Sequence, residues 1–124
     1  MYKVSIALLF TLIFWGYAPT DEVNVTATVY HAVEGQTDDT PLITASGKHI
    51  EPSNPASHRW IAVSRDLEKL GFVFGTKVTV ECAGEMNGIW TVQDRMNRRW
   101  KHRIDFLVNE GKMGKWDKVS IKIY

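Results

Sequence analysis

The stretch that decides the fold runs from residue 88 to residue 108 and reads "GIWTVQDRMNRRWKHRIDFLV". Residues 89–94 and 102–108 are strand-like segments, short and rich in β-branched and aromatic side chains. The residues between Asp94 and Asp105 are strongly basic, with Arg95, Arg98, Arg99, Lys101, Arg103 and, when protonated, His102. Each strand-like segment also carries one acid, Asp94 or Asp105. Two carboxylates therefore bracket a cationic loop.

Similar strand patterns recur along the chain at intervals of roughly ten residues. They cover residues 23–30, 42–47, 60–64, 75–83 and 117–124. Residues 64–71 predict a short helix of about two turns, with Ser64 as N-cap and Gly71 as its end. Residues 31–41 and 48–59 predict loops, and residues 84–88 predict a hairpin turn. Helices long enough for parallel crossovers are missing from this pattern, so we expect an all-β fold, closed as a small barrel.

The first eighteen residues predict a secretory signal peptide. Lys3 is followed by an uncharged apolar run to Ala18, with small residues at a plausible cleavage position. The run is somewhat short for a membrane crossing, which needs about 20 apolar residues, although an uncleaved anchor stays open. We therefore expect an exported protein with a leader at 1–18 and one domain at 19–124, in the periplasm or outside the cell.

Charge and cysteine content limit the possible partners. Without residues 1–18 the chain keeps 14 Lys and Arg against 14 Asp and Glu, so only the basic loop could attract a polyanion. Export and this balance argue against nucleic acid. The single cysteine, Cys82, excludes an intrachain disulfide and is expected to be a buried structural thiol. The histidines show no metal-ligand spacing. Neither a metal nor a cofactor is expected.

The ordered set of segments resembles a six-stranded double-psi β-barrel. "TATVY", "LITASGKHI", "WIAVS", "FGTKVTVE", "GIWTVQDR" and "HRIDFLV" occur in the order found in rare-lipoprotein-A-like domains, three-aspartate domains and the barrel of membrane-bound lytic transglycosylase A. The resemblance covers about residues 25–124. Its most specific part is "FGTKVTV", an Asp-terminated strand, and a second Asp eleven positions later within "RID".

This resemblance implies which residues form the site. The acid in "RID", Asp105, takes the position associated with acid/base chemistry on a glycosidic bond, and Asp94 lies beside it in the groove. A third position is Asp or His in those families but Ser64 here. Because serine does not titrate, Asp66 replaces it, or two carboxylates suffice, or the domain binds glycan without cutting it.

The chemistry of glycosidic bond cleavage also points to Asp94 and Asp105. Cleaving a glycosidic bond requires a proton donor whose pKa is raised, and partial burial or a neighbouring carboxylate raises it. Asp105 stands between Ile104 and Phe106, and if Asp94 converges on it the two titrate as a pair. The cations of the loop would oppose that rise, so we expect them to point mostly outward.

Several other side chains are candidates for holding a glycan. We assign substrate binding to Tyr30, Trp100, Arg95 and Ser64. Aromatic rings stack on sugar faces, and arginine matches carboxylates. Trp60 and Trp90 are alternative platforms, and Trp90 fits core packing equally well. The pair Asp38–Asp39 is expected in a solvated loop.

The sequence thus predicts a monomeric, exported, peptidoglycan-active enzyme, a lytic transglycosylase or a related glycan-cleaving protein, with Asp105 as acid/base and Asp94 as its partner. It would meet a membrane only through an uncleaved leader. Two alternatives stay open: a non-catalytic, expansin-like barrel that binds cell-wall glycan, and a barrel for protein–protein contact.

Overall fold

A computed structural model of the chain describes residues 21–33 and 40–124. The expected leader and the pair Asp38–Asp39 lie outside the described residues. Within them the chain forms six strands, one short helix and two 3-10 turns. The strands are β2 (Val23–Tyr30), β3 (Trp60–Val63), β4 (Lys77–Glu81), β5 (Gly88–Arg95), β6 (Arg103–Leu107) and β7 (Lys115–Ile123). The helical elements are η2 (Pro55–His58), α1 (Arg65–Glu68) and η3 (Gly84–Met86).

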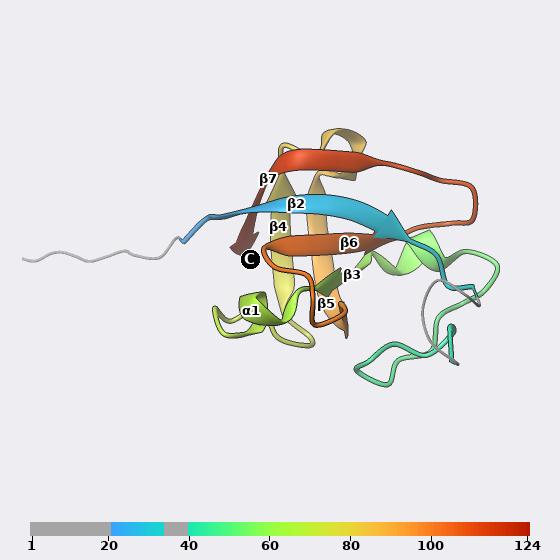
Figure 1. Cartoon of the computed structure of the whole chain (residues 1–124). Coiled ribbons are helices and arrows are strands. Elements are labelled where there is room, and N and C mark those ends of the chain that lie inside the picture. Colours follow the sequence, from blue (N-terminus) through green and yellow to red (C-terminus); the bar gives the residue numbers. More distant parts are fainter. Residues whose placement is uncertain (1–20, 34–39) are drawn as a thin grey trace, which may run out of the picture.

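The six strands close into one barrel in the order β2-β6-β3-β5-β4-β7. The β2–β6 and β3–β5 pairs are parallel, and the other four pairs are antiparallel. In Figure 1, β2 and β6 run side by side across the molecule, while β4 and β5 run nearly perpendicular to them in that view. The predicted all-β small barrel is confirmed, and its closure removes exposed sheet edges. A closed, mixed six-stranded barrel with little helix fits the double-psi architecture.

The alternating pattern of the strands fills the barrel core. Val78 and Val80 of β4 are fully buried, as are Val119 and Ile121 of β7. Three aromatic rings from three strands pack together. The ring centres of Trp90 and Phe106 lie 4.7 Å apart, and those of Phe106 and Trp116 lie 5.6 Å apart. Trp90, weighed above as a glycan platform, is therefore a core residue, and its indole N–H donates to the Met86 carbonyl at 2.8 Å.

Several local expectations are wrong, each for a physical reason. Residues 42–47 form no strand, because the chain turns at once: the Gly47 N–H donates to the Thr44 carbonyl, and only an isolated Ile43–His49 bridge remains. A 3-10 turn begins at Pro55, since the first helical position tolerates proline. Helix α1 has four residues rather than two turns.

Cys82 also differs from expectation. It follows the last residue of β4, where the backbone adopts a φ of 67° and turns the side chain out of the barrel pattern. The thiol is free and exposed, so the expected buried structural role is wrong. The alternation of Val78 and Val80 ends with the strand and does not extend to this residue.

The aromatic core gives a first prediction. Replacing Phe106 with alanine removes a fully buried ring that contacts Trp90 and Trp116, and should lower the free energy of unfolding by about 3–5 kcal/mol. Urea denaturation followed by circular dichroism measures the loss. The exposed Lys122→Ala serves as control, with an expected change within about 0.5 kcal/mol. An equally small change for Phe106→Ala would mean that this ring is not central to the core.

Candidate functional site

A cleft of about 500 Å³ opens where β5 and β6 meet the end of β3. Residues from β2, the 40–50 loop, β3, α1 and the 95–100 loop line it together. They are Tyr30, Pro41, Ile43, Ala62, Arg65, Asp94, Arg95, Met96, Asn97, Arg99, Trp100 and Asp105. Five of the six residues assigned from the sequence are therefore brought together, and Ser64 is the exception.

Strand register explains how the two acids meet. Strand β3 runs between β5 and β6, and Ala62 pairs with Asp94 on one side and with Asp105 on the other. Adjacent strands lie about 4.8 Å apart, so the two acids stand about 10 Å apart at the backbone with their side chains in the same cleft. The small side chain of Ala62 leaves the space between them open.

Asp105 is half-buried, and its surroundings shift its pKa upward. Burial raises the pKa of Asp105 above its ordinary value, and the negative charge of Asp94 raises it further. Two neighbours act in the other direction: the Thr28 hydroxyl donates a hydrogen bond to Asp105 Oδ1, and the Arg103 guanidinium lies close by. Arg103 Nη2 also donates to Thr28 Oγ1 at 3.3 Å. The net direction is upward, as a proton donor requires.

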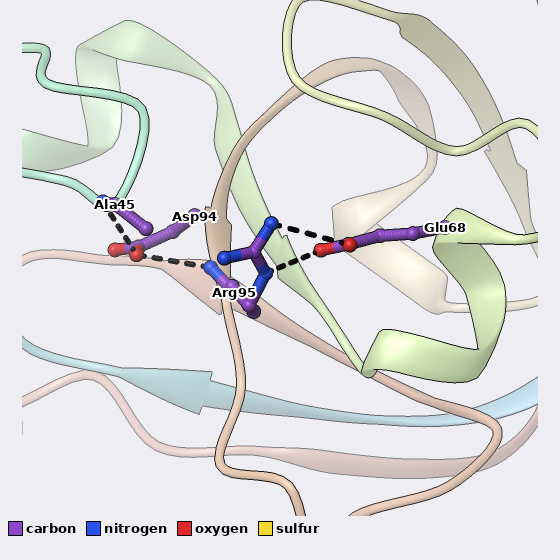
Figure 2. Close-up of polar contacts among 4 residues, drawn as sticks. All are labelled: Ala45, Glu68, Asp94 and Arg95. Atoms are coloured by element: carbon purple, nitrogen blue, oxygen red, sulfur yellow. Dashed lines mark hydrogen bonds and ion pairs between the residues drawn. The ribbon is translucent and has the colours of Figure 1, made fainter.

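Asp94 has the opposite surroundings. Its Oδ1 accepts the backbone N–H groups of Ala45 at 2.9 Å and Arg95 at 3.0 Å, as Figure 2 shows, and its Oδ2 accepts the Tyr30 hydroxyl at 3.0 Å. Three donors directed at one carboxyl group favour its ionised form. Burial, then the charge of Asp94, raises the pKa of Tyr30 well above its usual value, so Tyr30 stays a neutral donor.

The two environments separate the roles of the acids. Burial raises the pKa of the half-buried Asp105, whereas Asp94 accepts hydrogen bonds that favour a carboxylate. Two carboxyl groups in such different environments are typical of acid/base sites. The arrangement can protonate an oxygen of a ligand and stabilise a positive charge that develops nearby.

Arg95 and Trp100 border this pair. Arg95 forms two hydrogen bonds to Glu68 of α1, at 2.6 Å and 3.2 Å, so its charge is compensated (Figure 2). The guanidinium carbon of Arg103 lies 4.1 Å from the Trp100 ring centre, and that of Arg99 lies 4.9 Å from it. The half-buried indole therefore has a fixed orientation on the cleft wall.

Ser64 is fully buried and lies outside the cleft. Its Oγ accepts the Arg103 N–H at 3.1 Å, and its own N–H donates to the Arg103 carbonyl at 2.9 Å, which ties the end of β3 to the start of β6. Asp66 is also absent from the cleft lining. Burial raises the pKa of Asp66, but hydrogen bonds from the Ser64 side chain and the His102 N–H lower it more, so that this pKa lies below its ordinary value. Among the described residues, the acids that line the cleft are Asp94 and Asp105.

Sequence reasoning missed Thr28 and Arg65 and misjudged Arg103. Arg103 was expected to point outward with the other cations, yet it shares a strand face with Asp105 because the two are two residues apart on β6. That spacing was visible in the sequence. Thr28 pairs with Asp105 across the parallel β2–β6 ladder, and no local signal reveals such a register. Arg65 stands in the segment read as a helix start.

Comparisons with known proteins leave the family of this chain open. No protein-family model, no curated protein and no solved structure matches the sequence or the fold. Within residues 21–33 and 40–124, no helix has the length and apolar character needed to span a bilayer. In the same ranges no three His, Cys, Asp or Glu side chains gather as a metal site.

The Thr28 hydrogen bond gives a second prediction. Thr28→Val keeps the shape of the side chain but removes the donor that lowers the pKa of Asp105, so that pKa should rise. Carboxyl carbon chemical shifts, followed by NMR across a pH titration, measure it. Thr79→Val on β4, another half-buried strand threonine, is the matched control and should leave Asp105 unchanged. An unchanged Asp105 in Thr28→Val would contradict the assigned role of this hydroxyl.

The raised pKa of Asp105 also gives a prediction about stability. The folded protein holds this proton to higher pH than the unfolded chain does, so stability falls as pH rises from about 3.9, the unfolded value, through the folded pKa. Asp105→Asn abolishes this titration. The free energy of unfolding of the variant, relative to the parent, should therefore be larger at about pH 7 than at about pH 3. Urea denaturation at both pH values tests the sign, and a difference independent of pH would refute it.

Proposed function

We propose that this protein is an exported enzyme that cleaves glycan strands of peptidoglycan, acting as a lytic transglycosylase of the rare-lipoprotein-A-like and three-aspartate group. The observation that carries the proposal is the pairing of a half-buried Asp105 of raised pKa with a hydrogen-bonded Asp94 in one cleft. The apolar leader at residues 1–18 supports export, and the order of the strand motifs supports the group.

The chemistry assigned to Asp105 begins with proton donation. Asp105 gives its proton to the glycosidic oxygen as the bond from that oxygen to C1 breaks, and positive charge develops on the sugar ring. The resulting Asp105 carboxylate then takes the proton of the C6 hydroxyl of the same sugar, whose oxygen bonds to C1 and closes an anhydro ring. No activated water is needed, so one well-placed acid suffices.

Asp94 and the cleft walls support this reaction. The fixed charge of Asp94, held by Tyr30 and the Ala45 N–H, stabilises the developing positive charge. The indole of Trp100, oriented by Arg103, offers a flat face on which a sugar can stack. This route uses only one proton donor, so it does not require a titratable side chain at position 64, where this chain has serine.

A second function, non-catalytic binding of cell-wall glycan, has its own support. Thr28 and Arg103 both act to lower the pKa of Asp105, the direction that disfavours proton donation. Ser64, which replaces the third acid or histidine of the resembled families, serves a structural bond to Arg103. A cleft with these features would hold a glycan through Trp100 and its polar wall without cutting it.

Replacing Asp105 tests the proposal directly. Asp105→Asn should lower the rate of glycan cleavage by about 100-fold or more, because it removes the proton donor. Purified protein is incubated with peptidoglycan sacculi, and the soluble products are analysed by mass spectrometry. Anhydro-muropeptides released by the parent and lost in the variant are the expected result.

Matched controls separate chemistry from folding. Asp117 is an exposed acid on β7, and its variant Asp117→Asn should retain full activity. The melting temperature of Asp105→Asn should be equal to or higher than that of the parent protein. Products with ordinary reducing ends would indicate hydrolysis instead. Binding to sacculi without release would establish the binding function, and neither release nor binding would refute both and favour a role in protein contact.

A further inference from the structure

Arg65 has a buried donor without an acceptor. It is the first residue of α1 and belongs to the lining of the same cleft as Asp105. Its Nε is buried and has no hydrogen-bond partner among the described residues, and no carboxylate within those ranges forms an ion pair with it. A guanidinium N–H removed from water without an acceptor is costly, so the group calls for an explanation.

The neighbouring acids among the described residues form no ion pair with Arg65. Glu68 pairs with Arg95, and Asp66 lies outside the cleft lining, where its Oδ2 accepts the His102 N–H at 3.0 Å and its Oδ1 is buried without a hydrogen-bond partner. Asp94 and Asp105 lie level with Ala62, three residues before Arg65 and about 10 Å back along the strand direction. No carboxylate of the described residues therefore neutralises the end of the cleft at Arg65.

A second cation faces the same cleft. Arg99 lines it, lies over the Trp100 ring at 4.9 Å, and has no ion pair with a described carboxylate. Arg95 differs, because Glu68 has already neutralised it (Figure 2). Of the three lining arginines, Arg65 and Arg99 are thus available to a ligand. A planar guanidinium matches a carboxylate, which accepts two parallel hydrogen bonds.

We propose that Arg65 and Arg99 form a carboxylate-binding subsite next to the Asp94–Asp105 pair, so that the cleft selects glycans bearing a carboxylate over neutral ones. The inference rests on the proposed glycan-binding cleft and names the class of glycan that it takes. The carboxylate comes from a lactyl ether on the sugar or from a peptide attached to it. Arg65 fixes the position of this carboxylate, and Trp100 on the cleft wall stacks on a sugar of the same glycan.

Binding measured without cleavage tests the subsite separately from catalysis. Full-length protein carrying Asp105→Asn leaves the glycan intact and is titrated calorimetrically with three oligosaccharides of equal length. The first is neutral poly-N-acetylglucosamine. The second alternates N-acetylglucosamine with N-acetylmuramic acid that carries no peptide, and the third is the same alternating glycan with stem peptides attached. At least one carboxylate-bearing glycan should bind with a Kd about 10- to 100-fold below that of the neutral one. The two charged glycans show which carboxylate is read.

Variants of Arg65 assign the effect. Adding Arg65→Gln should remove most of this preference and leave the Kd for the neutral glycan unchanged. Arg65→Lys keeps a positive charge but lacks the planar guanidinium, and should retain part of the preference for carboxylate-bearing glycans. Arg98→Gln, an exposed arginine outside the cleft lining, is the matched control and should bind like the parent. Circular dichroism melting verifies that each variant folds.

Each outcome has a defined meaning. Equal Kd values for all three glycans, or an Arg65→Gln that weakens the neutral glycan as much as the charged ones, would overturn the subsite. So would competition by inorganic phosphate with no preference for a carboxylate. A preserved preference in a protein that never cleaves sacculi would keep the subsite and refute the enzymatic function. Cleavage without any preference would do the reverse.

Discussion

The position of β3 between β5 and β6 is the constraint on which the candidate site depends. Asp94 and Asp105 are eleven residues apart along the chain, on strands that do not pair with each other, and each pairs with Ala62 from its own side. One of these pairings is parallel and the other antiparallel, which a simple hairpin cannot provide. The mixed topology of the closed barrel thus converts a basic loop with two flanking acids into a cleft that holds both acids.

The surroundings of the two acids follow from their strands. Asp105 pairs with Thr28 across the parallel β2–β6 ladder and lies two residues after Arg103 on β6. Its position therefore brings it close to a hydroxyl donor and to a guanidinium. Asp94 ends β5, where the 40–50 loop supplies the Ala45 N–H and β2 supplies Tyr30. Burial still dominates at Asp105 and raises its pKa. The fold therefore gives two chemically identical groups different protonation tendencies.

Much of this architecture was predictable from the sequence, and the failures have clear causes. Alternation in 23–30, 75–83 and 117–124 identified β2, β4 and β7 because each buries one face, although Ile123 at the end of β7 is 47 % exposed. Pairing register is set by contacts distant in sequence, so Thr28 as the partner of Asp105 had no local signal. The exposure of Cys82 depends on a backbone turn that alternation cannot reveal.

The smallest side chain in the cleft has a consequence of its own. Ala62 lines the cleft between the two acids and pairs with each of them across its own strand ladder. One methyl group therefore limits the space that a ligand can occupy between the acids. A bulkier residue there would narrow the cavity and, by removing water from Asp105, would raise the pKa of that carboxyl group further. Steric access and proton chemistry are thus linked at this position, so that divergence at Ala62 would alter both properties together.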